Sequence, residues 1–129
     1  MKVLIDTQCW LWMNASPERM SAKTRAMLLA PSTERMLSAA SIWEIGIKFY
    51  LGKLVLPVAP ADYVPARLAT TITSPLAISG THALRASSLP AHHRDPFDRM
   101  IVAQALVEGV PVLSSDIQLD AYGIQRFSP

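Results

Sequence analysis

The stretch Lys2-Val-Leu-Ile-Asp6 shows how this chain is built. Its apolar run is too short for a helix and ends at an aspartate, which is typical of a short buried β-strand. The segment Val110-Pro-Val-Leu113 has the same character near the other end of the chain. Between and after these runs, helical patterns alternate with further short strand patterns. The alternation predicts an α/β fold whose parallel sheet carries helices on both faces.

The remaining elements are expected from apolar periodicity and from residues that begin or end helices. The clearest helix start is Asp95-Pro96-Phe97-Asp98, because aspartate suits the N-cap and proline the first helical position. With 129 residues and 50% hydrophobic side chains, the chain fits one domain, residues 1–129. Strands are expected at 35–38, 76–78 and 124–127, and helices at 7–13, 22–29, 41–51, 61–70, 81–87 and 96–108.

Composition excludes several classes of protein. Cys9 is the only cysteine, so a disulfide framework is excluded and a reducing, cytoplasmic location is expected. The longest uncharged stretch, 68–84, contains Pro75 and Gly80 and is not a membrane span. A net charge of +2 permits binding to nucleic acid but provides no broad cationic surface.

The few acidic residues are informative through their positions. Asp6 follows the first predicted strand directly, and Asp116 lies just past the strand that ends at Leu113. In open α/β sheets, ligands bind outside the carboxyl ends of the strands, where both residues lie. Each aspartate is explained equally well as the cap of the helix that follows it.

Two further carboxylates lie near the starts of predicted helices. After Ser41, only Glu44 and Lys48 are polar in helix 41–51, and they share one face. They form either an exposed ion pair or a site at which Glu44 projects into a cleft on the edge that carries Asp6. Asp98 shares a helix face with its apolar i+3, i+4 and i+7 neighbours and so points toward the interior, although it also complements the helix dipole.

Together, Asp6, Glu44, Asp98 and Asp116 are expected at one edge of one sheet. Crowded carboxylates repel one another and are driven toward protonation unless a cation compensates. Mg²⁺ or Mn²⁺ accepts oxygen ligands of this kind. Such an ion lowers the pKa of a water molecule and stabilises charge on a phosphodiester, so the pattern indicates metal-dependent phosphodiester hydrolysis.

Five motifs carry a resemblance that extends over essentially the whole chain. They are Leu4-Ile5-Asp6-Thr7, Ser41-Ile-Trp-Glu44-Ile45 with Lys48 and Gly52-Lys-Leu54, Leu89-Pro-Ala-His-His-Arg-Asp-Pro-Phe-Asp98-Arg99, Ile101-Val-Ala-Gln-Ala105 and Leu113-Ser-Ser-Asp116. With these motifs the sequence resembles PIN-domain ribonucleases, specifically the VapC-type toxins of type II toxin–antitoxin pairs. The resemblance implies a PIN-like three-layer α/β/α sandwich and a Mg²⁺-dependent endoribonuclease.

The resemblance also implies roles for individual residues. The family's acids correspond to Asp6, Glu44, Asp98 and Asp116: the three aspartates would hold Mg²⁺, or Mn²⁺, with Glu44 as a further ligand or a water-orienting base. Thr7 matches the hydroxyl residue after the first acid, and Ser114 stands where many relatives have threonine. Asp95 belongs to the His-x-Asp-Pro-Phe-Asp pattern of the subgroup; capping is its expected role, with metal contact as the alternative.

The family further implies an RNA substrate, a homodimer and a cognate antitoxin whose C-terminal segment occupies a groove beside the acids. Lys48, Arg94 and Arg99 lie near the acids in sequence and are expected to bind the RNA backbone, unless they are simply solvated charges. The residues expected either to line a partner surface or to pack in the core are Trp10, Trp12, Met13 and Met20.

Other chemistries are less well supported. His92 and His93 are adjacent in a predicted loop, lack the helical histidine spacing of zinc enzymes and are not expected to be catalytic. An aspartyl phosphohydrolase with Asp6 as nucleophile would usually carry a second aspartate two residues on, where this chain has Gln8. The main alternative is a catalytically silent PIN-fold protein with a binding or regulatory role, which the loss of one of the four acids would have favoured.

Overall fold

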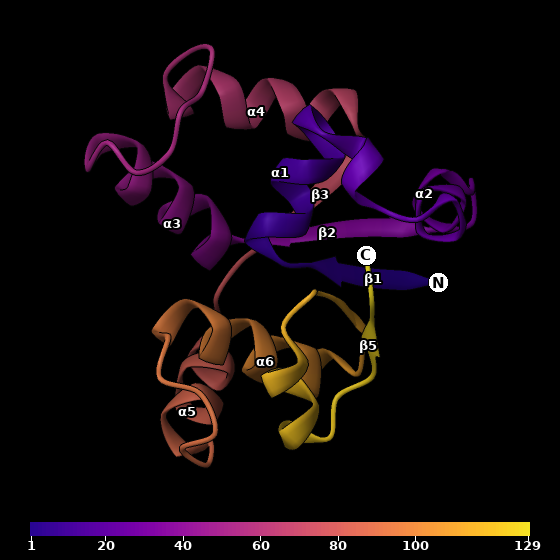
Figure 1. The fold of residues 1–129 in the computed structure, drawn as a ribbon. Helices are drawn as coiled ribbons and strands as arrows, with labels where there is room; N and C mark the ends of the chain where they lie inside the picture. Colours follow the sequence, from indigo (N-terminus) through magenta and orange to yellow (C-terminus); the bar gives the residue numbers. More distant parts are fainter.

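The computed structural model describes residues 1–129 and contains one five-stranded sheet, in which all paired strands are parallel (Figure 1). The strand order is β3-β2-β1-β4-β5, so β1 is central and β3 and β5 form the edges. The strands are β1 (Lys2–Ile5), β2 (Glu34–Ser38), β3 (Thr73–Leu76), β4 (Val112–Leu113) and β5 (Arg126–Phe127).

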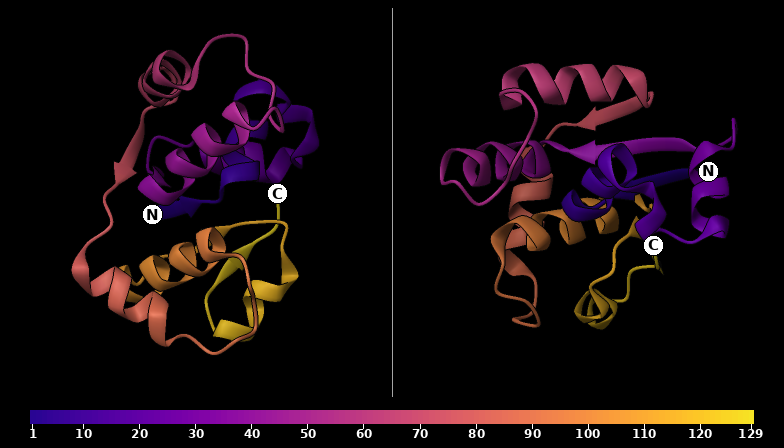
Figure 2. Two further views of the ribbon diagram at one scale, coloured as in Figure 1. Left: turned by 90° about the vertical axis from the view of Figure 1, so that its left-hand side faces the viewer. Right: turned by 45° about the horizontal axis from the view of Figure 1, so that its top comes forward.

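Helices cover both faces of this sheet, which confirms the predicted three-layer α/β/α sandwich. On one side lie α1, α3 and α4, and on the other lie α5 and α6 (Figures 1 and 2). No helix combines the length and the apolar character needed to cross a membrane. The helices are α1 (Thr7–Ala15), α2 (Ala22–Leu29), α3 (Ala39–Tyr50), α4 (Pro60–Thr70), α5 (Gly80–Ser88) and α6 (Pro96–Glu108), with short 3₁₀ helices at η1 (Pro17–Arg19) and η2 (Ile117–Tyr122).

The central strand β1 joins two hydrophobic cores. Val3 and Ile5 belong to the core that includes Trp10 of α1, whereas Leu4 belongs to the core that includes Ile101 of α6. Successive side chains of a strand point to opposite faces, so a strand covered on both faces needs a continuous apolar run. This requirement explains why the apolar run of β1 continues through Ile5 and ends only at Asp6, the first residue past the strand.

The predicted helix boundaries that depend on capping residues agree with the structure. Ser21 caps α2 and Asp95 caps α6, and α6 ends at Gly109, whose φ of 65° is left-handed. Helix α3 begins earlier than expected, at Ala39, because the Ser38 hydroxyl accepts the Ala40 N–H at 3.0 Å and caps the helix where β2 ends.

The expected positions of two strands need correction. Strand β3 occupies Thr73–Leu76 rather than 76–78, and it includes Pro75, which an edge strand accommodates because one side of it makes no ladder bonds. Strand β4 is reduced to Val112–Leu113, which pair with Leu4 and Ile5 of β1.

Replacing Leu28 with alanine is expected to lower the free energy of unfolding by about 2–5 kcal/mol, because it opens a cavity in a packed core. The adjacent Leu29 is the matched control, since it is 80% exposed whereas Leu28 is 2% exposed. Leu29→Ala should change the free energy by less than about 0.5 kcal/mol. Urea denaturation followed by circular dichroism measures both variants, and equal losses would contradict the packing of α2.

Candidate active site

The acids that sequence analysis singled out line one cavity of about 360 Å³ at the carboxyl edge of the sheet. Asp6 follows β1, Asp116 lies three residues past β4, and Glu44 and Asp98 project from α3 and α6. Strand β1 and its neighbour β2 both end beside the first turns of α1 and α3 (Figure 1). The predicted convergence of the four carboxylates is therefore present in the structure. Polar neighbours that also line the cavity are Thr7, Gln8, Lys48, Lys53, Asp95 and Ser115.

Asp6 both caps a helix and faces the cavity. Its Oδ1 accepts the Cys9 N–H at 2.7 Å, which begins α1, and the residue is almost fully buried. Burial raises the pKa of Asp6, although hydrogen bonds with Ser114 and Cys9 oppose the shift. Ser114 is itself buried, and its hydroxyl accepts the Asp116 N–H at 3.1 Å, so it lies between the two aspartate positions.

Glu44 is a cavity carboxylate rather than half of an exposed ion pair. The residue is only 5% exposed, and Thr7 Oγ1 donates a hydrogen bond to its Oε1 at 2.6 Å. Lys48 Nζ lies 2.6 Å from Glu44 Oε2, and this contact raises the pKa of the lysine. The sequence left open an ion pair with Lys48 or a Glu44 that projects into a cleft. The structure combines the two, because the i,i+4 pair exists and its acidic half points into the cavity.

The surroundings of Asp98 strongly disfavour its ionised form. Burial, followed by repulsion from Asp95, raises the pKa of Asp98 to about 7, although the nearby His93 lowers it. Asp95 Oδ1 accepts the Phe97 N–H at 2.8 Å, so the expected capping role of Asp95 is confirmed. A set of oxygen donors with too little positive charge around it suits a hard divalent cation.

The structure also places in this site a residue, His93, that sequence analysis did not expect to be catalytic. His93 Nε2 lies 2.7 Å from Asp116 Oδ2 and 3.3 Å from Asp98 Oδ2. One ligand atom from each of the three residues lies within 4.8 Å of the others. The position of His93, two residues before the Asp95 N-cap, was the available signal for its proximity to Asp98.

Of the three basic residues expected to bind RNA, only Lys48 lines the cavity. Arg94 is exposed outside it. The expectation for Arg99 needs correction, because its guanidinium donates to the carbonyl oxygens of Leu89 and Pro90 at 2.9 and 3.0 Å and so fastens the loop before α6. Trp10 is likewise a core residue and not part of a partner surface.

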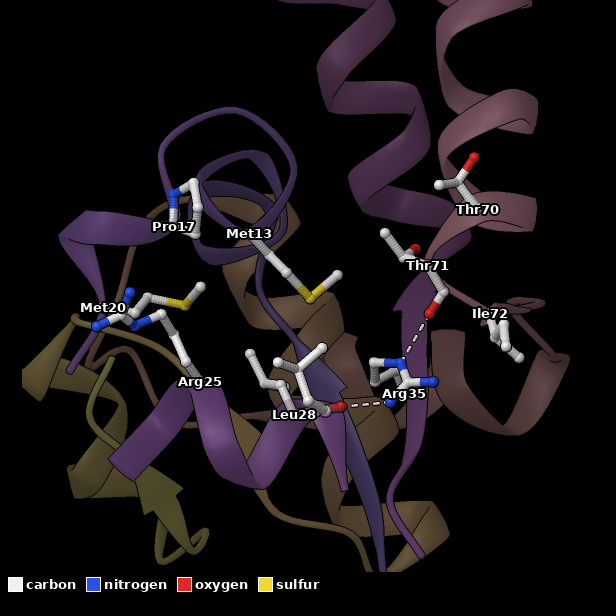
Figure 3. A pocket seen from close by; sticks show the side chains of 10 residues that line it. Met13, Pro17, Met20, Arg25, Leu28, Arg35, Thr70, Thr71 and Ile72 are labelled. Carbon is white, nitrogen blue, oxygen red and sulfur yellow. Dashed lines mark hydrogen bonds between the residues drawn. The ribbon is translucent and has the colours of Figure 1, made fainter. Parts of the chain in front are cut away.

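Met20 is also buried in the core, whereas Trp12 and Met13 are partly exposed. Met13 and Met20 line a second cavity, of about 370 Å³, beside the amino end of β2 (Figure 3). Arg35 donates hydrogen bonds there to the carbonyl oxygens of Thr71, at 2.8 Å, and Leu28. No carboxylate lines this cavity, so it lacks the groups needed for metal-dependent hydrolysis.

Comparison with known proteins identifies the family. A family model described as PIN domain matches residues 3–125. This chain belongs to the PIN-domain family. A relative, Ribonuclease VapC16 of Mycobacterium tuberculosis, is 44% identical over 71 residues, which cover 54% of this chain and 50% of the relative. The matched segment thus spans about half the length of that protein.

Solved structures share the PIN fold over nearly the whole chain. VapBC2 from Rickettsia felis bound to a promoter DNA fragment aligns with a TM-score of 0.72 at 12% identity, covering 99% of this chain and 98% of that chain. DNA-bound VapBC from Salmonella typhimurium aligns with a TM-score of 0.68 at 18% identity and the same coverage. At these identities the similarity establishes the fold.

The raised pKa of Asp98 predicts how the metal-free protein responds to pH. A carboxyl whose pKa is raised from 3.8 to about 7 on folding stabilises the protein at low pH and loses that contribution as pH rises through about 7. In EDTA, the free energy of unfolding of the wild type should therefore fall from pH 5 to pH 8 more steeply than that of Asp98→Asn. The difference should be at most about 1.4 kcal/mol per pH unit.

Urea denaturation across this pH range measures the two slopes. Asp62→Asn, which changes an exposed acid of α4, is the control and should keep the wild-type slope. Parallel curves for the wild type and Asp98→Asn would show that Asp98 does not titrate in this range.

Proposed function

We propose that this PIN-domain protein is a metal-dependent endoribonuclease and the toxin of a VapC-type toxin–antitoxin pair. The observation that carries the proposal is the convergence of four carboxylates from four different elements in one cavity, with too little positive charge to balance them. The relative named Ribonuclease VapC16 and the VapBC complexes of the same fold support this activity and this biological role.

In this proposal Asp6, Asp98 and Asp116 hold Mg²⁺, and Mn²⁺ can replace it. Glu44 acts as a further ligand or as the base that orients water. When bound, the ion supplies a Lewis acid that promotes ionisation of water and stabilises charge on the phosphodiester. Buried hydroxyls orient the acids: Thr7 donates to Glu44, and Ser114 links Asp6 to the backbone of Asp116.

Positive side chains at the rim of this cavity would bind the RNA backbone. Lys48 and Lys53 line the cavity, and Arg94 is exposed on the loop that carries His93. They would offset repulsion between the acids and the polyanionic substrate. Arg99 is omitted from this role because its donors are used within the loop.

The proposed antitoxin would dock on an apolar cavity beside the acids. Gln8, Leu11 and Leu54 line both this cavity and the acidic one, so a bound segment could continue from one into the other. The partly exposed Trp12 supplies aromatic surface to it, which suits burial against a protein partner.

We also propose that residues 1–129 form one domain that acts in the cytoplasm.

The proposed homodimer would use one face of α3. Trp43, Tyr50 and Leu51 are each more than 60% exposed; the first two are seven residues apart and so lie on the same side of the helix, and Leu51 caps its carboxyl end. An exposed apolar stripe of this kind is typical of a protein interface.

RNA cleavage tests the proposed activity. With total cellular RNA as substrate, cleavage should require Mg²⁺ and stop in EDTA, and Asp6→Asn or Asp116→Asn should slow it by about 100-fold or more, because each removes a metal ligand. The exposed Asp62→Asn should leave the rate unchanged. Metal-independent cleavage, or full activity in Asp6→Asn, would falsify the mechanism, and no cleavage by the wild type would favour a catalytically silent PIN protein.

Light scattering after size exclusion tests the homodimer. The wild type should elute with twice the mass of the chain, and Trp43→Glu should elute as a monomer because a charge would be buried in the interface. Leu29→Glu, at a still more exposed position on α2, should remain dimeric. A monomeric wild type would refute the dimer without affecting the nuclease assignment.

A further inference from the structure

The imidazole of His93 lies between two of the proposed metal ligands. Its Nε2 contacts Asp116 Oδ2 at 2.7 Å and Asp98 Oδ2 at 3.3 Å, and its side chain is largely buried. Asp116 comes from the segment after β4, whereas Asp98 belongs to the first turn of α6. The ring therefore connects acids that are supplied by two separate elements.

The backbone determines which ring nitrogen carries the hydrogen. The Asp95 N–H lies 3.1 Å from His93 Nδ1, and because a backbone N–H can only donate, Nδ1 must accept. In the neutral ring the hydrogen then resides on Nε2, which faces the two carboxylates. His93 is thus oriented as a hydrogen-bond donor to Asp116, with Asp98 Oδ2 nearby at 3.3 Å, and not as a nitrogen ligand to a metal.

The loop that carries His93 is firmly anchored. The His93 N–H donates to the Tyr122 hydroxyl at 2.9 Å, and that hydroxyl donates to the Pro90 carbonyl oxygen at 2.9 Å. Arg99 donates to the carbonyl oxygens of Ala86 and Leu89 at 3.0 and 2.9 Å. These contacts fix the backbone that leads to the ring and the backbone of His93 itself, so the ring position is built into the fold.

We propose that His93 is a positioning residue that acts through Asp116 and Asp98 to set the divalent-cation affinity of the site. This inference rests on the proposed metal-dependent function. Asp116 Oδ1 accepts the Gln118 N–H at 3.0 Å and Oδ2 faces His93 Nε2, so both oxygens are oriented and each keeps a lone pair for the cation. Hydrogen bonds to ligating carboxylates of this kind hold them in their binding geometry.

The alternative, that His93 itself ligates the ion, makes a different prediction. Ligation through Nε2 would require that nitrogen to lose its hydrogen, so the neutral ring would have to give up the contact with the Asp95 N–H. A nitrogen ligand would also favour Mn²⁺ over Mg²⁺, which prefers oxygen. A donor to the carboxylates affects both ions alike.

Calorimetric titration of the full chain with Mg²⁺ and with Mn²⁺ separates these roles without any RNA. His93→Phe should weaken the binding of both ions by about 10–100-fold, because the ring remains but the donor is lost. His93→Gln keeps an N–H donor and should recover most of the affinity. The matched control is His92→Phe, which retains an aromatic ring at the exposed position beside Tyr122 and should bind both ions like the wild type.

A second measurement reads the ring directly. Long-range ¹H–¹⁵N NMR of the metal-free protein should show His93 in the Nε2–H form, and circular dichroism should show that His93→Phe is folded. An Nδ1–H form, unchanged affinities in His93→Phe, or a loss confined to Mn²⁺ would overturn the positioning role.

The metal site itself is tested separately. Asp116→Asn should abolish the binding that His93→Phe only weakens. A wild type that binds neither ion would remove the proposed function and this inference together, whereas normal wild-type binding with an unaffected His93→Phe would remove the inference alone.

Discussion

Carboxylates held close together and partly out of water impose the main constraint on this molecule. Burial and mutual repulsion both disfavour ionisation, and Asp98 shows the result as a pKa near 7. The position of the acids follows from the parallel sheet. Ile5 pairs with Leu113, so the chain leaves β1 and β4 side by side, with Asp6 immediately after one strand and Asp116 shortly after the other. Crowding and burying the acids lowers the stability of the fold, and the hydrophobic cores on both faces of β1 offset this loss.

The protein's own groups limit the repulsion between the acids. Glu44 is paired with Lys48, Asp116 receives a hydrogen bond from His93, and the raised pKa of Asp98 favours its neutral form. Asp6 and Asp116 also accept backbone N–H groups as helix caps. A carboxylate has about four lone-pair positions, so one contact of this kind leaves room for a cation. Capping and metal binding are therefore compatible roles for the same residue.

The sequence could predict some features of the fold and the site but not others. Local signals were sufficient for β1, for the caps at Ser21 and Asp95 and for the end of α6 at Gly109, because each depends on neighbouring residues. The choice between cap and site at Asp6 could not be made from the sequence, since both roles require the same residue at the same place. The spacing of Glu44 and Lys48 likewise predicts their pairing but not the burial of the acid, which depends on packing around α3.

The least predictable contacts are those that join distant segments of the chain. His93 and Asp116 are separated by 23 residues, and no periodicity connects a loop before α6 with the segment after β4. Arg99 was misassigned for a related reason: its charge suggested a substrate contact, but its donors serve backbone carbonyls in a loop that needs bracing. Ordering this loop costs conformational entropy, which is offset by its own hydrogen bonds and by the contacts that a fixed ring can make. The contacts observed are with the two carboxylates, so the bracing and the acid cluster are best understood as parts of one structure.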